Sequence, residues 1–444
     1  MLKMKMLYSR FLKYIVLPIA DKSMKTSVSY YYHQIQNMNS YSPQEINEWQ
    51  NDKIRKLIAF VYNNTKYYRI LFNKHGIIPE DIKTIDDLKY IPILTKKEIR
   101  NNFNDIISTN IKNIPHKKSA TGGSTGDPLV YWLDHNSWSY SNANIIYNWE
   151  RVGYNYGEKY IALGSTSLFV DKKSSIKHQI YYKLKNKIGL NGINMSHDVC
   201  REYADLIQKK NIQYIYGYAS AIYLFAKYLV ETNTQLEIYC CFTTSERLTD
   251  IYRETISKAF KCKIVDCYGA HDGGLTAFSH VEGYFEVGYN CIVRQDNPDN
   301  NGIGPALLTD LTNYAMPLIN YKIGDELQIQ SEKNKNYPYN GQIINKVMGR
   351  TSDVIHLENG SVLTGPGFTI LFKDIPVEHY CIEKIGHNSI KCKMKKLSTF
   401  AVDHEKIIYQ TLKKQMGPES KIYFEYTDEI ELTKSGKRQY FKNN

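Results

Sequence analysis

The chain has 444 residues, of which 57 are Lys or Arg and 45 are Asp or Glu, so its formal net charge is +12. This length allows two or three domains, and the 42% hydrophobic and 23% charged residues are ordinary for a globular protein and unlike a disordered one. No segment approaches the roughly 18 to 20 uncharged apolar residues of a spanning helix, which excludes a polytopic membrane protein. The eight cysteines form no CxxC pair. They favour reduced thiols in a cytoplasm over a disulfide scaffold or a zinc site.

The positive charge and the 38 tyrosines raise the question of nucleic-acid binding, because basic side chains follow phosphates and aromatic rings stack on bases. The basic clusters are short and scattered, and they match no nucleic-acid-binding module. We therefore expect no nucleic-acid partner. The surplus charge suits a protein that handles anionic nucleotides or lies near anionic lipid.

Residues 1–40 form a basic amphipathic segment at the start of the chain. Its basic residues include Lys3, Lys5, Arg10 and Lys13, and Leu12, Ile15, Val16 and Ile19 follow helical spacing. Pro18 should kink or end such a helix, and Lys13 interrupts the apolar stretch that a signal peptide needs. Two interpretations stay open. We favour a helix docked on the protein's own core, and the alternative is peripheral contact of residues 1–20 with the inner face of a membrane.

The remaining elements are expected in three regions. Residues 42–105 are expected to be helical, with one apolar stripe. Strands and helices alternate from 158 to 268, which is typical of a doubly wound, mostly parallel sheet. The expected strands are 160–164, 212–217, 236–243 and 263–268, and the expected helices are 197–210, 220–232 and 247–260.

Strands dominate from 284 to 348 and predict a β-rich subdomain. Strands at 354–357, 380–394 and 421–426 with a helix at 403–415 predict a small, mobile α+β domain at the C terminus. The expected division of this α/β protein is the segment 1–40, a large domain over 41–349 and a small domain over 350–444.

Two polar loops follow predicted strands, FTTSERL after one and YGAHDGG after the next. Parallel sheets bind ligands at the carboxyl ends of their strands. Ser245, Glu246 and His271 are therefore candidates for a substrate pocket.

The strongest local signal is SATGGSTGDP at 119–128. Glycines let a backbone approach an anion and free its N–H groups, and hydroxyls add donors, as binding of a triphosphate requires. The loop also formally matches GxSxG, the nucleophile elbow of serine hydrolases, but Pro128 and the strand-like continuation argue against the helix that such an elbow needs. The candidate phosphate-binding residues are Thr121, Gly122, Gly123, Ser124, Thr125 and Gly126.

Five motifs in one order resemble the adenylate-forming (acyl- and aryl-CoA synthetase) superfamily. They are TGGSTGDP, YGAHDGG at 268–274, NYKIGDE at 320–326, GRTSDVI at 349–355 and ELTKSGKRQ at 431–439. Within the superfamily, YGYAS and TTSERL resemble the phenylacetate–coenzyme A ligase branch and capsular polysaccharide biosynthesis proteins of the CapK type. The resemblance spans about residues 50–440.

This resemblance implies that a carboxylate attacks the α-phosphate of ATP to give an acyl-adenylate and pyrophosphate. Tyr268 with Gly269 would contact adenine, Asp325 would accept the ribose hydroxyls, Arg350 would reach the nucleotide and Asp272 would hold Mg²⁺. Thr351, Ser352 and Asp353 would form the hinge of the small domain. Lys437 would be the catalytic lysine that reaches the α-phosphate.

Several positions depart from the superfamily pattern. Asp272 stands where Glu is usual, Leu129 where Lys often follows the loop, and Ser352 where a charged residue is common. An active enzyme is still expected, because each group that the chemistry needs is present. The partners would be a small-molecule carboxylate and an acceptor, which would be an amino sugar or an amino acid, giving an amide, or coenzyme A, giving a thioester. A catalytically degenerate nucleotide-binding or scaffold protein is the alternative from another class.

Overall fold

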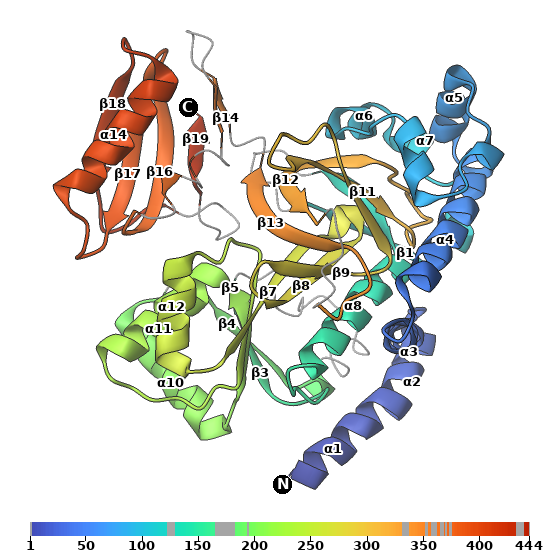
Figure 1. Ribbon diagram of the computed structural model, residues 1–444. Helices are drawn as coiled ribbons and strands as arrows, with labels where there is room; N and C mark the ends of the chain where they lie inside the picture. Colours follow the sequence, from blue (N-terminus) through green and yellow to red (C-terminus); the bar gives the residue numbers. More distant parts are fainter. Residues whose placement is uncertain are drawn as a thin grey trace.

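The computed structural model describes residues 2–121, 129–164, 183–192, 195–330, 337–350, 354–356, 362–364, 368, 371–372, 375–431 and 439–443. Figure 1 shows a large part built around an 11-stranded sheet and a smaller C-terminal part with a four-stranded sheet. Over the described stretches, no helix combines the length and apolar character needed to cross a bilayer.

The large sheet has the strand order β10-β11-β12-β13-β9-β8-β7-β6-β5-β3-β4 and changes from parallel to antiparallel at β7. The predicted alternation over 158–268 is confirmed. The parallel half consists of β4 (Lys187–Asn191), β3 (Tyr160–Gly164), β5 (Tyr214–Tyr218), β6 (Cys240–Thr244) and β7 (Lys263–Ala270), with helices α10 (His197–Lys210), α11 (Ala219–Glu231) and α12 (Asp250–Phe260).

Helices cover both faces of this parallel half, as a doubly wound sheet requires. Successive side chains of a strand point to opposite faces. Ile161 and Leu163 of β3 accordingly pack with α10, α11 and α12. Tyr160 and Ala162 pack with α8 (His135–Glu150) on the other face.

The strand-rich region predicted over 284–348 continues the same sheet in antiparallel pairing. These strands pack together with the helices over 42–113 around a third hydrophobic core. Helix α4 begins at a capping box in which Ser42 and Glu45 satisfy each other's backbone N–H groups. The strands are β8 (Leu275–Val281), β9 (Tyr284–Val287), β10 (Cys291–Gln295), β11 (Ile303–Asp310), β12 (Tyr321–Ile329) and β13 (Ile343–Arg350). The helices and short helical turns over 42–113 are α4 (Pro43–Asn64), α5 (Lys66–His75), η2 (Pro79–Asp81), η3 (Ile85–Tyr90), α6 (Lys96–Asn101), α7 (Phe103–Ile106) and η4 (Ile111–Asn113).

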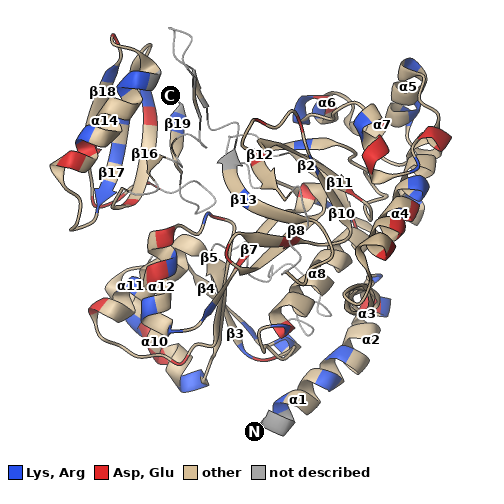
Figure 2. Ribbon diagram, viewed as in Figure 1, with Lys and Arg blue, Asp and Glu red and all other residues tan. Residues whose placement is uncertain are grey.

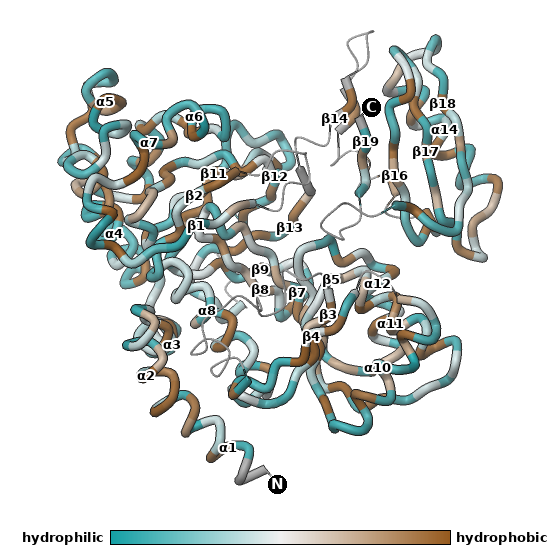
Figure 3. Tube along the Cα trace, turned by 180° about the vertical axis from the view of Figure 1, so that it is seen from behind, coloured by the Kyte–Doolittle hydropathy of each residue, from teal (hydrophilic) through white to brown (hydrophobic). Residues whose placement is uncertain are grey.

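The N-terminal segment forms a nearly continuous helix of α1 (Leu2–Phe11), the π-helical turn η1 (Leu12–Val16) and α2 (Leu17–Met24), followed by α3 (Val28–Met38). The buried residues Leu12 and Leu17 belong to the core under α8, which confirms the favoured interpretation of a helix docked on the protein. Pro18 does not end the helix; it lies in the first turn of α2, directly after the π-helical turn η1. Figure 3 shows hydrophobic residues at intervals along this segment.

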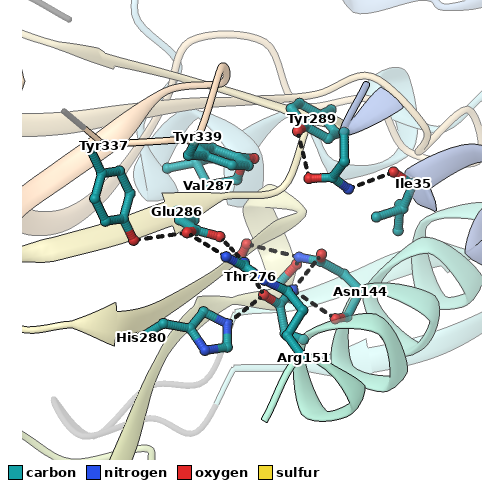
Figure 4. A network of polar contacts seen from close by, with 12 residues as sticks. Ile35, Asn144, Arg151, Thr276, His280, Glu286, Val287, Tyr289, Tyr337 and Tyr339 are labelled. Atoms are coloured by element: carbon teal, nitrogen blue, oxygen red, sulfur yellow. Dashed lines mark hydrogen bonds and ion pairs between the residues drawn. The ribbon is translucent and has the colours of Figure 1, made fainter. Parts of the chain in front are cut away.

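A partly buried polar network joins α8 to the antiparallel half of the sheet (Figure 4). Both Nη atoms of Arg151 donate to Glu286, and Tyr337 donates to the same carboxylate at 2.8 Å. Asn148 accepts from Arg151 and pairs with His280. The adjoining cavity is about 10 Å³, room for at most one water molecule.

The C-terminal part is the predicted α+β unit. Its sheet has the order β18-β17-β16-β19. Lys227 Nζ of α11 lies 2.8 Å from Glu378 Oε2 of β16, so an ion pair connects the two parts of the chain. The elements are β14 (Val354–His356), β15 (Val362–Thr364), β16 (Val377–Gly386), β17 (Ser389–Lys396), α14 (Val402–Met416), β18 (Lys421–Tyr426) and β19 (Phe441–Asn443).

Candidate active site

The candidate site begins where the parallel strands end. Strands β5, β6 and β7 run in the same direction, so Tyr218, Thr244 and Ala270 end at one edge of the sheet. The loops that follow carry YGYAS, FTTSERL and YGAHDGG. This is the edge at which open α/β sheets bind ligands.

Tyr268 and Asp325 are bonded to each other. The Tyr268 hydroxyl on β7 donates to Asp325 Oδ2 on β12 at 2.6 Å. The short distance is typical of a hydrogen bond to a carboxylate. The pair brings together the two residues that the sequence predicts at the adenine and the ribose, and it fixes the orientation of both side chains.

A second tyrosine orients Asp272. This residue lies in the short helical turn η6 (His271–Gly273) directly after β7 and is only 9% exposed. Its Oδ2 accepts a 2.8 Å hydrogen bond from the Tyr321 hydroxyl at the start of β12. Both candidate carboxylates are therefore held by tyrosine hydroxyls that join β7 or its loop to β12.

His271 and Lys117 place the ribbon of β1 (His116–Ala120) and β2 (Val130–Asp134) beside the same turn. His271 is exposed, yet the protein around it disfavours the imidazolium and lowers its pKa; the Lys117 charge lowers the pKa further, whereas the Asp272 charge opposes the shift. Lys117 is also exposed, and the surrounding protein lowers its pKa for the same reason. A lysine and a histidine beside a carboxylate make a polar surface that carries a cation.

The same ribbon carries the predicted phosphate loop. Strands β1 (His116–Ala120) and β2 (Val130–Asp134) pair antiparallel, with Ala120 opposite Val130. Thr121 N donates to Leu129 O, and Leu129 N donates to Thr121 Oγ1, both at 2.9 Å. Thr121 and Leu129 thus fasten the two ends of the loop. The residues between them, Gly122, Gly123, Ser124, Thr125 and Gly126 among them, lie outside the described residues.

Burial and charge connect this ribbon to the magnesium candidate. Burial raises the pKa of Tyr131 on β2, and the negative charges of Asp272 and Asp310 raise it further. Asp310 is engaged by Ser137 and Thr312 and is part of the buried scaffold. Tyr131 of the ribbon therefore lies near Asp272, and Tyr321 joins Asp272 to β12, the strand that carries Asp325.

The candidate pocket residues of FTTSERL have different roles. Ser245 has a left-handed backbone with φ of 68°, which turns the chain sharply after β6. Glu246 Oε2 accepts from the backbone N–H of Ser220 at 2.9 Å, in the first turn of α11. Tyr218, the N-cap of α11, offers no side-chain bond. Glu246 therefore supplies the missing cap and joins the loops after β5 and β6.

The other predicted residues are placed only in part. Arg350 ends β13 with its backbone opposite Asp325, and Gly269 lies in β7 opposite Thr276. Thr351, Ser352, Asp353 and Lys437 lie outside the described residues.

Sequence reasoning missed two residues of the site. Tyr321 belongs to NYKIGDE, and its place four residues before Asp325 in that motif was an available signal. Lys117 stands in the unremarkable stretch HKK, and nothing in the sequence connected it to His271.

The fit of a magnesium ion rests on Asp272. Within the described ranges no three His, Cys, Asp or Glu side chains gather as a metal cluster. Mg²⁺ is commonly held by one or two carboxylates together with substrate phosphates, so a single oriented carboxylate beside a phosphate loop is a suitable donor set.

The chain is similar to several known proteins. A family model for the CapK C-terminal domain matches residues 371–444. The chain is 23% identical to Protein CapK of Staphylococcus aureus, over 94% of this chain and 92% of that protein. It is 21% identical to a phenylacetate–coenzyme A ligase of Pseudomonas putida, over 73% of this chain and 75% of that enzyme.

A solved structure shows the same fold over nearly the whole chain. The 2-hydroxyisobutyryl-CoA ligase in the postadenylation state, in complex with R3-HIB-AMP, aligns with a TM-score of 0.68 and 12% identity over 92% of both chains. The same ligase in the thioesterification state, in complex with 2-HIB-AMP and CoA, gives a TM-score of 0.53 over 90% of both chains.

Proposed function

The chain belongs to the adenylate-forming superfamily and to its CapK-like branch, and on that premise we propose that it is an AMP-forming ligase that activates a small carboxylate with ATP. A carboxylate oxygen attacks the α-phosphorus, the bond to the bridging oxygen of pyrophosphate breaks, and an acyl-adenylate forms. The reaction joins two anions, so the protein's work is positioning and electrostatic stabilisation.

The convergence of three segments on one sheet edge carries this proposal. Asp325, oriented by Tyr268, offers a carboxylate to the ribose diol, and the Tyr268 ring offers a face to adenine. The ribbon that Thr121 and Leu129 close presents the phosphate loop. Together these groups would bind a nucleoside triphosphate from its base to its phosphates.

Asp272 would hold Mg²⁺ beside the phosphates, with Tyr321 fixing the carboxylate. When bound, the ion would neutralise charge on the pyrophosphate as it leaves. Lys437 would reach the α-phosphate and stabilise the charge that develops there.

For the second step we propose an amine acceptor, an amino sugar or an amino acid, whose nitrogen attacks the acyl carbon and releases AMP to give an amide. The resemblance of YGYAS and TTSERL to capsular polysaccharide biosynthesis proteins of the CapK type motivates this choice and a place in surface-polysaccharide biosynthesis. Coenzyme A is the second candidate, favoured by the similarity to a phenylacetate–coenzyme A ligase.

All eight cysteines are free thiols, which fits a reducing cytoplasm.

The test supplies ATP, magnesium and a panel of carboxylates, and it measures pyrophosphate release with no acceptor, with amines or with coenzyme A. We expect release to depend on one carboxylate class and an amide to appear only with an amine. A thioester in place of the amide would establish the second candidate. Lack of pyrophosphate release with every carboxylate would favour a nucleotide-binding scaffold.

A further inference from the structure

The outer side of the N-terminal helix carries an unusual row of exposed hydrophobic side chains. Leu7, Phe11, Ile15 and Ile19 recur at every fourth position and are 64%, 47%, 51% and 65% exposed. Met6 and Tyr14 are exposed beside them. We call the six residues Met6, Leu7, Phe11, Tyr14, Ile15 and Ile19 the outer face.

The opposite side of the helix is fixed to the protein. Leu12 and Leu17 are buried in the core, and Tyr8 donates to the carbonyl of Leu184 at 2.8 Å. Lys13 forms a 2.8 Å ion pair with Glu150 of α8. The outer face therefore cannot turn inward without breaking these contacts.

The π-helical turn Leu12–Val16 keeps the outer face continuous. In a regular α-helix, residues spaced four apart drift around the axis, because a turn holds 3.6 residues. A π-helical turn is wider and offsets this drift. Phe11 and Ile19 therefore stay on one side of the helix across the turn.

The charge around the outer face is positive. Residues 1–20 contain no Asp or Glu, and Figure 2 shows blue and no red along α1. Arg10 lies four residues before Tyr14 and Lys22 lies eight residues after it, and both basic side chains are exposed. Asp21 is buried, where it accepts hydrogen bonds from Thr26 and Ser29, so it does not neutralise this surface.

We propose that the outer face binds the surface of an anionic lipid bilayer, with the helix lying in the plane of the interface. Large apolar side chains flanked by Arg and Lys suit the boundary between acyl chains and anionic headgroups. A second copy of the chain is a poorer partner, because a symmetric dimer through this face would bring two positive surfaces together. This inference is independent of the proposed ligase activity.

The experiment is cosedimentation of the full chain with vesicles of phosphatidylcholine and phosphatidylglycerol, and with vesicles of phosphatidylcholine alone. We expect binding to the anionic vesicles that weakens as salt is added. Phe11→Gln with Ile19→Gln should weaken binding roughly tenfold or more, because two large apolar contacts are lost. Arg10→Gln with Lys22→Gln should mainly lower the preference for anionic lipid.

The matched control is Val402→Gln with Ile407→Gln on α14, whose side chains are 72% and 48% exposed. This variant should bind like the original chain. All variants change exposed positions, so unchanged circular dichroism and thermal midpoints are expected. The proposal is overturned if the original chain does not bind either vesicle, if the Phe11 and Ile19 variant binds equally well, or if sedimentation velocity shows that this variant only dissociates a dimer.

Discussion

The Tyr268 hydroxyl donates a 2.6 Å hydrogen bond to Asp325 Oδ2, which connects two motifs 57 residues apart in the chain. Tyr268 ends the parallel half of the sheet and Asp325 lies in the antiparallel half, so the pair spans the change in sheet architecture. A ring proposed for adenine and a carboxylate proposed for ribose are thus positioned together before any nucleotide arrives.

Because of this hydrogen bond, we expect the Tyr268 hydroxyl to contribute to ATP binding in addition to the stacking of its ring. We expect Tyr268→Phe to raise the KM for ATP about ten- to a hundredfold, because a hydrogen bond to a carboxylate contributes about 1.5–3 kcal/mol. Tyr268→Ala should raise KM further, because the ring is lost as well. Steady-state kinetics of pyrophosphate release measures both. Tyr337→Phe is the matched control, because it removes a tyrosine bond to Glu286 in the remote network, and its KM should not change.

Asp272 should be required for adenylation. Asp272→Ala is expected to abolish pyrophosphate release at all magnesium concentrations, because the proposed ligand is lost. Asp272→Glu should keep activity, since it restores the carboxylate usual in the superfamily. Tyr321→Phe should raise the magnesium concentration needed for half-maximal rate, because the carboxylate is no longer oriented. Asp403→Ala, an exposed change on α14, is the control, and full activity of Asp272→Ala would refute the magnesium role.

Lys437 is predicted to act in the first step only. Lys437→Ala should lower the rate from ATP and carboxylate about 10²- to 10³-fold, as loss of one preorganised donor does. Synthetic acyl-adenylate supplied with the acceptor should react at nearly the original rate. Lys434→Ala is the neighbouring control and should affect neither assay. Equal losses in both assays would assign Lys437 to folding or to both steps, and no loss would make it a solvated lysine.

The ion pair between Lys227 and Glu378 should hold the C-terminal part in its observed position. Glu378 is buried, and its carboxylate also lies 3.1 Å from Lys395 of β17. Lys227→Met removes the connection between the parts, whereas Lys395→Met removes a contact within the C-terminal part. We expect only Lys227→Met to broaden the distances measured by double electron–electron resonance between labels on α11 and α14. Identical distance distributions would show that other contacts fix the orientation.

His280 should make stability depend on pH. Burial lowers the pKa of His280 to about 4, so the unfolded chain takes up this proton first as pH falls below about 6.5. The free energy of unfolding should therefore decrease from about pH 6.5 to 4, by at most about 1.4 kcal/mol per pH unit from this group. His280→Gln should flatten that slope in urea unfolding, and His387→Gln, in the exposed turn between β16 and β17, should not. An unchanged slope in His280→Gln would refute the assignment.

The sequence by itself determined the local elements and their order. The helix predicted at 197–210 is α10 (His197–Lys210), and the strand predicted at 421–426 is β18 (Lys421–Tyr426). Hydrophobic periodicity and caps are local properties, and they decide such elements wherever burial on one face is strong. The order of the five motifs also predicted the superfamily, because motif order is a property of the chain and not of its packing.

Only the tertiary structure decided which distant groups meet. The strands over 284–348 were predicted, but their continuation of the parallel sheet through the β7–β8 pairing was not. Tyr321 reaches Asp272, and Glu246 on the loop after β6 reaches the first turn of α11. The docked helix likewise leaves Phe11 and Ile19 outside while Leu12 and Leu17 are buried. Contacts of this kind depend on strand register and on the surface available for packing, and these arise only when segments far apart in the sequence compete for the same core.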